Sequence, residues 1–420
     1  MPVPYPRWLA GVVPQSLGAK VSLFFAALFV TLGLVLPYFP VWLNSRGMSP
    51  IEISTITAAP LFLRVVFTPA MGLIADRLGD YRVVIITLAW SALGLALVVS
   101  GLPGFWLILT VGVALQLAIS AMIPLTETIA VSAVRSAGLD YGRMRLWGSI
   151  TFIVANFVGG LVIEALGGGS GIWLIASAVL LTVASAHLLP APTRGAIPAA
   201  RPPRAHWRMS LPMRLLRSRL FVVFLVAIGC IHGAHATFYT FGALHWQAQG
   251  LAAAWVGTLW AIGVIAEVLL FAFSAPVVRR FSPVALIVAG AAASVLRWGI
   301  MGFDPPLAVL LPLQALHGLT YGAAHLGAIH FITRAVPSLA LGSAQSLYAV
   351  IAAGLVQGLV GLASGALYPS LGGAIYFLAA AVSLLGLVAG LVLLKRWDGG
   401  LLWPEALAAP ATPIAPATAG

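Results

Sequence analysis

Several ionisable side chains lie within long apolar runs of this sequence, where charge is otherwise scarce. Glu127 and Glu267 lie within segments that are mostly apolar, and charged residues are only 8% of the 420-residue chain. An ionisable side chain held away from water costs free energy unless it is paired or faces a water-filled cavity. Residues of this kind can hold a solute, or take up and release a proton.

Glu127 is followed 18 positions later by Arg145, within the segment DYGRMRLWGS. One short polar break separates the two, so we expect the carboxylate at the end of one helix and Arg145 at the start of the next. Arg143 is interpreted as a loop anchor, and Trp147 as a packing or stacking ring. The alternative is that both arginines only hold the helix end in water and that Glu127 has no particular role.

Two further runs place polar side chains on one helix face. His232, His235 and Tyr239 are spaced by three and four residues, and His317, Tyr321 and His325 by four, spacings that share a face. A polar face within a span indicates a cavity or a helix interface. No carboxylate or thiolate near the His-x-x-His pair completes a metal-ligand set, so a hydrogen bond to a neighbouring helix is the main alternative to a solute contact.

Glu267 and two arginines lie deep within their expected helices. Glu267 is about 24 Å from the start of its run and Arg64 about 20 Å from the start of its own, too deep to reach either surface easily. We expect Glu267 to function in proton exchange with His317 or His325, whose imidazoles titrate near neutral pH. Arg64 and Arg297 are the candidate cations for pairing or for an anionic solute.

The elements that must position these residues are membrane helices. A hydrophobic fraction of 61% and a mean hydropathy of +1.05 exceed what a soluble core can bury. A helix needs about 20 apolar residues to cross the hydrocarbon. Twelve runs qualify, namely 21–43, 51–75, 83–101, 105–131, 145–166, 171–190, 220–247, 251–275, 283–303, 306–333, 343–367 and 371–394. The predicted fold class is therefore an all-α integral membrane protein with 12 transmembrane helices.

The positions of the basic residues predict orientation. Of the 22 Lys and Arg residues, Arg46 falls on one side, Arg64 and Arg297 fall within spans, and the other 19 fall on the opposite side. The positive-inside rule therefore places both termini in the cytoplasm. The net charge of +12 is explained in this way without a nucleic-acid partner. The single cysteine, Cys230, cannot form a disulfide within the chain.

The spans divide six and six about a segment rich in Pro and Arg. We expect residues 1–190 to form an N-terminal six-helix bundle, 191–219 a cytoplasmic linker, 220–394 a C-terminal six-helix bundle and 395–420 a disordered cytoplasmic tail. Two halves of near-equal size are typical of transporters in which one half rocks against the other around a site near the midplane.

The loop GLIADRLGDYR resembles the signature loop of the major facilitator superfamily. The residues that fit are Gly72, Asp76, Arg77, Gly79 and Arg82, whereas Asp80 stands where that family usually has a basic residue. The resemblance implies a conformational latch, with Gly72 allowing two helices to approach closely and Asp76 pairing with an arginine of a neighbouring helix. A plain positive-inside loop is the alternative. The equivalent loop of the second half, APVVRRFSP, keeps only the basic pair.

DYGRMRLWGS with its upstream glutamate also resembles the lactose-type proton symporters, which implies that Glu127 and Arg145 grip a solute. In that family a carboxylate follows the histidine matching His317 by three residues, and here the position is Thr320. The segments PLTE, GAHATFYTFGALHWQAQG, GVIAEV and RWGIMG resemble the phenylpropionate permease family more closely, over about residues 20–394. That resemblance implies transport of an aromatic acid.

We therefore expect a monomeric secondary transporter in the bacterial inner membrane that imports a small organic solute with a proton and needs no cofactor. The expected substrate-binding residues are Glu127, Arg145, Trp147, Arg64, His235 and Tyr239, and the expected proton-coupling residues are Glu267, Arg297, His317 and His325. A disaccharide or nucleoside symporter is the alternative, and a membrane sensor or scaffold is a more distant one. No nucleotide loop, zinc motif or serine elbow supports an enzyme.

Overall fold

The computed structural model describes residues 16–190 and 210–404, and these residues are almost entirely helical. In the first half, each of the six predicted spans is one helix. These are α1 (Leu17–Ser45), α2 (Pro50–Leu78), α3 (Tyr81–Gly101), α4 (Phe105–Ala137), α5 (Tyr141–Leu166) and α6 (Gly171–Ala186). Most of the helices extend a few residues beyond the predicted spans and end at turn residues: Gly79 and Gly138 adopt left-handed backbone after α2 and α4, and Asp140 caps α5.

In the second half, three of the six spans are interrupted. The first is α8 (Arg219–Gly233) followed by α9 (His235–Ala248). The other two interrupted spans are α13–η3–α14 (Leu307–Ala315, Gly318–Ala323, Ala324–Ala335) and α15–η5–α16 (Leu341–Val350, Ile351–Val356, Gln357–Leu371). The three remaining spans are α10 (Ala253–Ala272), α12 (Pro283–Met301) and α17 (Tyr376–Arg396). η3 and η5 are π-helical turns, which occur mostly at functional sites.

Twelve spans are present, as predicted. Eleven continuous helical segments of the described chain are long and apolar enough to cross a membrane, and the last of them, 59 residues from Ser338 to Arg396, is long enough for two crossings. These two join at the short helix η6 (Gly372–Ile375), where Gly372 adopts a positive φ of 52°. The chain is a multi-pass membrane protein.

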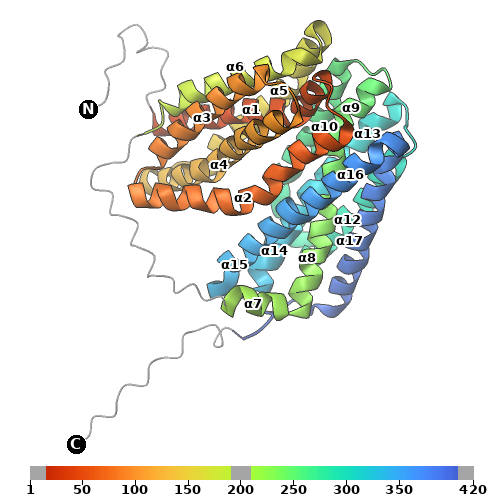
Figure 1. Ribbon diagram of the computed structural model, residues 1–420. Coiled ribbons are helices and arrows are strands. Elements are labelled where there is room, and N and C mark those ends of the chain that lie inside the picture. Colours follow the sequence, from red (N-terminus) through yellow and green to blue (C-terminus); the bar gives the residue numbers. More distant parts are fainter. Residues whose placement is uncertain (1–15, 191–209, 405–420) are drawn as a thin grey trace, which may run out of the picture.

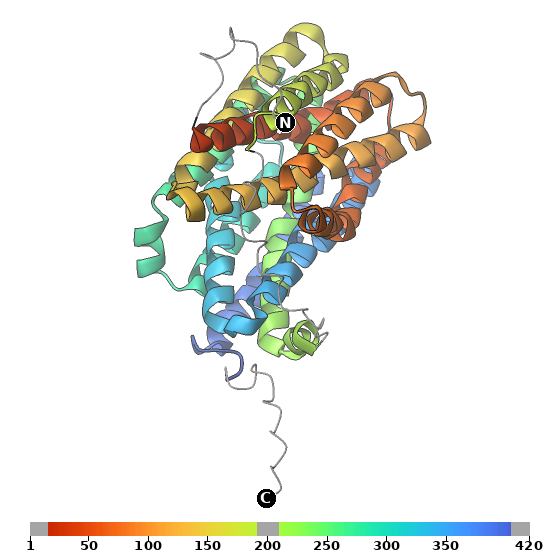
Figure 2. The ribbon, with the colours of Figure 1, turned by 90° about the vertical axis from the view of Figure 1, so that its left-hand side faces the viewer.

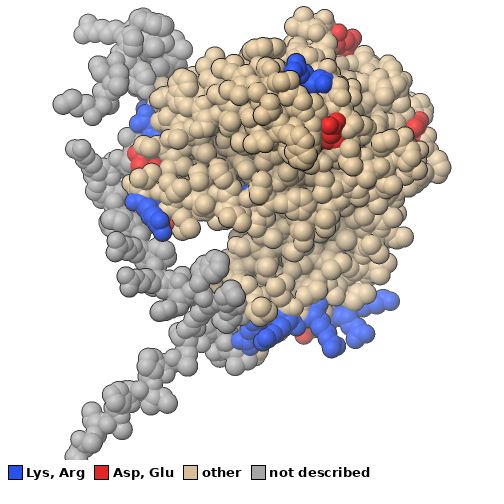
Figure 3. All heavy atoms as spheres, in the orientation of Figure 1, with Lys and Arg blue, Asp and Glu red and all other residues tan. Residues whose placement is uncertain are grey.

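The spans form two six-helix bundles inclined to each other. Figures 1 and 2 show the helices of the first half (red to yellow-green) running at a steep angle to those of the second half (green to blue). The bundles meet at one end and separate toward the other. Figure 3 shows the resulting hollow between two lobes on the left-hand side of the molecule.

The bundles touch through glycines at the closed end. A Cβ atom at Gly257 of α10 would overlap the backbone oxygen of Asn156 of α5, and one at Gly160 of α5 would overlap the backbone of Ala253. On the other side, a Cβ at Gly365 of α16 would overlap Ser54 of α2. We refer to these α5–α10 and α2–α16 contacts as the seam. The seam lies on the face opposite the loops that join α2 to α3 and α4 to α5.

Part of the predicted linker and tail is folded. Most of the linker, 191–209, lies outside the described residues, but α7 (Ser210–Arg217) follows it. The tail was predicted to be disordered from residue 395, which is wrong for its first part: Lys395 and Arg396 end α17, the Leu402 N–H donates to the Ala335 oxygen at 2.7 Å, and Trp403 is buried. Residues 405–420 lie outside the described part.

Candidate functional site

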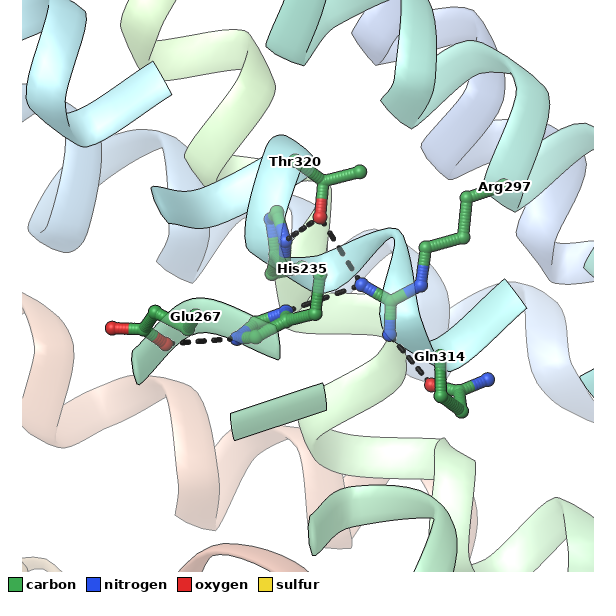
Figure 4. Close-up of polar contacts among 6 residues, drawn as sticks. His235, Glu267, Arg297, Gln314 and Thr320 are labelled. Carbon is green, nitrogen blue, oxygen red and sulfur yellow. Dashed lines mark hydrogen bonds and ion pairs between the residues drawn. The ribbon is translucent and has the colours of Figure 1, made fainter. Parts of the chain in front are cut away.

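A buried arginine lies at the centre of a polar network in the second half. Arg297 of α12 is only 1% exposed. Its guanidinium nitrogens lie 2.6 Å from Gln314 Oε1, 3.2 Å from Thr320 Oγ1 and 3.2 Å from His317 Nδ1. Figure 4 shows these contacts converging from α12, α13 and η3, with Glu267 at the far end of the chain of contacts. Three neutral acceptors thus replace water around the buried charge.

The directions of these hydrogen bonds follow from the chemistry of arginine. A guanidinium only donates, so His317 Nδ1 must be unprotonated and its proton must lie on Nε2. That nitrogen is 3.4 Å from Glu267 Oε2. His235 donates from Nδ1 to the Ile231 oxygen at 3.0 Å, so its Nε2 accepts from the Thr320 hydroxyl at 3.1 Å. All of these contacts are satisfied when His317 and His235 are both neutral.

Aromatic rings complete the surroundings of Arg297. Its guanidinium carbon lies 4.4 Å from the ring centroid of Trp298 and 5.2 Å from that of Phe238, distances at which an aromatic face stabilises a cation. The side chain is closed off from the cavity in this conformation. Arg297 was expected to face a partner or a solute, and in the structure its partners are neutral side chains.

Two glycines bring Glu267 to this network. A Cβ at Gly318 of η3 would lie 2.9 Å from the Ala266 oxygen, and one at Gly322 would lie 2.9 Å from Leu270. Their spacing of four residues lets η3 lie directly against α10, because neither carries a side chain on that face. His317, which immediately precedes η3, thereby reaches Glu267.

The second predicted face is confirmed as a stack of rings. His317 and Tyr321 have centroids 5.5 Å apart at 14°, and Tyr321 and His325 have centroids 6.1 Å apart at 9°. His325 Nδ1 lies 2.8 Å from the Tyr348 hydroxyl, which also lies 3.3 Å from His232 Nδ1. The network therefore extends to α8 and α15 on the side of the hollow. Tyr348 was not singled out in the sequence, because nothing in its own segment pairs it with a histidine.

The first half contributes two arginines to the same cavity. Tyr141, at the start of α5, interacts electrostatically with both Glu127 and Arg145. The guanidinium of Arg145 lies 3.9 Å from the ring centroid of Phe29 on α1. Arg145 also interacts electrostatically with Glu267 of the second half, and Arg64 does so with Tyr321. Cations of one half thus face the carboxylate and rings of the other.

Not every predicted site residue faces the Arg297 network or the arginines opposite it. Trp147 is 53% exposed and lies about 200° around α5 from Arg145, which places the two side chains on opposite faces of the helix. Arg143 is 89% exposed and pairs with Asp140 at 3.7 Å, in accord with its interpretation as a loop anchor. Tyr239 and His235 face the network, with ring centroids 5.8 Å apart.

The predicted latch is not engaged in this conformation. Among the described residues, no neighbouring atom lies within 4 Å of the position that a Cβ at Gly72 would take, so the close helix approach expected there is not made by residues 16–190 and 210–404. Asp76 accepts a hydrogen bond from the Tyr81 hydroxyl instead of pairing with an arginine of a neighbouring helix. Arg82 donates to the His187 oxygen at 2.7 Å, and Arg77 lies in the last turn of α2. The physical reason is that the bundles are apart at this end.

Comparison with known proteins agrees with this architecture. Two inclined six-helix bundles with charged groups of both halves facing a central cavity define a secondary transporter of the major facilitator type. The chain matches the model of the MFS_1 like family over residues 18–379, and it belongs to that family.

Relatives and solved structures are transporters as well. The chain is 33% identical over 363 residues, 85% of its length and 92% of the relative's, to a probable 3-phenylpropionic acid transporter of Escherichia coli K12. It is 26% identical to the maltose permease of Geobacillus stearothermophilus, over 89% of this chain and 94% of that one. A crystal structure of the nucleoside transporter NupG has the same fold, with a TM-score of 0.80, 17% identity and coverage of 90% of this chain and all of that one.

Proposed function

We propose that this protein imports an aromatic carboxylate together with a proton by alternating access. The observation that carries the proposal is the distribution of charge around the cavity: Arg64 and Arg145 on the first half, and Glu267 on the second. An arginine binds a carboxylate through two parallel hydrogen bonds, and the rings of Tyr239 and Tyr321 can contact an aryl group. The relative described as a 3-phenylpropionic acid transporter supports this substrate class.

Glu267 is the proposed proton carrier. His317 cannot accept a second proton on Nδ1 without losing its hydrogen bond from Arg297, because a protonated imidazole has no acceptor. Glu267 can exist in either form, since both a carboxylate and a carboxylic acid have an oxygen that can accept from the His317 Nε2–H, which lies 3.4 Å from Oε2. The proton bound to Glu267 would cross together with the solute anion and be released to the opposite aqueous phase. His325 remains the second candidate carrier, because Glu267 interacts with it electrostatically.

We further propose that the termini lie in the cytoplasm and that the structure is open to that side. The hollow is bordered by the ends of the spans next to which most Lys and Arg residues lie, and the seam closes the opposite face. This orientation follows the positive-inside rule and places the protein in the cytoplasmic membrane of a bacterium. Each chain carries both halves, so we expect a monomer to be the functional unit.

The test is proton entry into proteoliposomes. Purified protein is reconstituted with a pH dye inside, and 3-phenylpropionate, maltose and a nucleoside are added outside in turn, with protein-free liposomes correcting for leakage of undissociated acid. We expect acidification only with the aromatic acid. It should be lost in Arg145→Gln and retained in Arg143→Gln, a matched change two residues away on an exposed side chain.

A response to maltose or the nucleoside alone would favour the sugar or nucleoside alternative, for which the maltose permease is a relative. No response to any compound would contradict symport of these substrates.

A further inference from the structure

A second pocket lies between the two bundles, between the charged groups and the seam. It has a volume of about 90 Å³ and is lined by α1, α2 and α4 of the first half and by α9 and α16 of the second. Its polar lining consists of five uncharged side chains: Thr57, Gln116, Tyr239, Thr240 and Gln357. At about 30 Å³ for each water molecule in the liquid, the pocket has room for about three water-sized groups, the size of one polar edge of a ring.

Several polar atoms of this pocket are uncommitted. Gln116 donates from Nε2 to the Ile56 oxygen at 3.0 Å, which leaves its Oε1 available. Within the described residues, neither the Gln357 amide nor the Tyr239 hydroxyl has a hydrogen-bond partner. Thr240 and Thr57 lie 3.4 Å apart across the two bundles. An apolar pocket with a few convergent polar groups is typical of a ligand site.

The backbone of α15–η5–α16 holds Gln357 in this position. Gln357 directly follows the π-helical turn η5, whose wider turn changes the register of the helix. A Cβ at Gly358 of α16 would overlap the ring of Phe62 of α2, and one at Gly354 of η5 would lie 3.3 Å from the Leu61 oxygen. The chain therefore lies close against α2 on both sides of Gln357. Gln357, between these two glycines, carries a long polar side chain that lines the pocket.

The position of the pocket relative to the arginines sets the orientation of a solute. Thr57 precedes Arg64 by seven residues on α2, which is two turns, or about 10 Å, on nearly the same face. Tyr239 is shared, because it lines the pocket and interacts electrostatically with Glu267. An acid held through its carboxylate at Arg64 and extended toward the seam would place the far edge of its ring in this pocket. No Asp, Glu, Lys or Arg lines it, so the far end of the solute is expected to be uncharged and polar.

Resting on the proposed function, we propose that this pocket is a subsite for a ring hydroxyl, so that hydroxylated 3-phenylpropionates are preferred over the unsubstituted acid. The Gln357 amide would pair with that hydroxyl, assisted by Thr240. A site built to hydrogen-bond a hydroxyl disfavours the analogue without it, since its own polar groups are then left unpaired.

The experiment is calorimetric binding of 3-phenylpropionate, 3-(3-hydroxyphenyl)propionate and 3-(4-hydroxyphenyl)propionate to the purified full-length protein in detergent. We expect one hydroxylated acid to bind about tenfold more tightly than the parent acid. Gln357→Leu should abolish this ratio while binding of the parent acid persists. Gln249→Leu, the same change on an exposed residue next to α9, should leave the ratio unchanged. Thr240→Val is the second variant should Gln357→Leu fail to fold.

The outcomes separate this inference from the proposed function. Equal or weaker binding of both hydroxylated acids relative to the parent acid would overturn the subsite and leave aromatic acid transport standing. A preference that survives in both Gln357→Leu and Thr240→Val would also overturn it. Failure of all three acids to bind would overturn the subsite and the proposed substrate class together.

Discussion

At the residue scale, the tautomer of His317 distinguishes the groups that can carry a proton from those that position them. Arg297 donates to Nδ1, so the Nε2–H of His317 faces Glu267. Thr320, which occupies the position of a carboxylate in the lactose-type symporters, is bound by both Arg297 and His235. The carboxylate of this network instead comes from α10, so the site combines a different set of helices from the one that the resemblance implies.

Replacing Glu267 by Gln should separate exchange from accumulation. The amide is close in size to the acid but cannot release a proton, so uphill uptake driven by a proton gradient should be abolished, while exchange of labelled for unlabelled solute persists. Both rates are measured in the same proteoliposomes. Normal accumulation by Glu267→Gln would rule out this residue as the carrier and direct attention to His325.

Replacing Arg297 by Lys should destabilise the second half. An ammonium cannot reach Gln314, Thr320 and His317 simultaneously, because it lacks the planar fork of the guanidinium. Each unpaired buried group costs about 1–3 kcal/mol, so the apparent Tm in detergent should fall. Arg280→Lys, on an exposed side chain, serves as the control. An unchanged Tm in Arg297→Lys would show that the network contributes little stability.

At the element scale, helix ends were predictable and helix interruptions were not. Most predicted span limits agree with the helix ends within a few residues, because the bilayer fixes the length of an apolar run. Turn residues such as Gly138 and Asp140 mark where helices end and begin. The break at Ala234 and the π-helical turns η3 and η5 leave hydropathy unchanged, so the sequence gives no signal for them. Gln116 and Gln357 could have been noticed as amides in apolar spans, but their meeting depends on how the bundles dock.

Because the two bundles are in close contact at the seam, we predict that a side chain at Gly257 prevents closure of that face. Gly257→Val would overlap the Asn156 backbone, and overpacking of this kind costs about 1–3 kcal/mol, a shift of about 5- to 150-fold in the balance between states. Spin labels across the seam should report longer distances, and uptake should fall. Gly94→Val serves as the control, because a Cβ at Gly94 has no neighbour within 4 Å. A short distance in Gly257→Val would contradict the tight contact.

At the scale of the whole molecule, the two ends of the second half are joined through α7. The Arg214 guanidinium lies 4.8 Å from the centroid of Trp403, and Leu215 of the same helix is fully buried. Proline, arginine and alanine in the flanking segments favour disorder when considered alone, which is why the sequence predicted a linker and a tail here. Contacts between segments nearly 190 residues apart cannot be inferred from either segment by itself.

Trp403→Ala should loosen α7. Loss of the buried ring and of its contact with Arg214 removes about 3–5 kcal/mol of local stability, so hydrogen exchange in residues 210–217 should accelerate while the core spans remain protected. Trp106→Ala, at a side chain that is 75% exposed, should leave this exchange unchanged. Equal protection of α7 in both variants would show that the tail does not hold it.

The separation of the two lobes at one end (Figure 3) also makes the protein wedge-shaped with respect to the bilayer. A wedge occupies more area in one leaflet than in the other, and this excess changes sign when the opposite end opens. The work done against lateral pressure therefore differs between the two states of the cycle. We therefore expect lipids that raise packing pressure in one leaflet to shift the balance between these states without binding to any site on the protein.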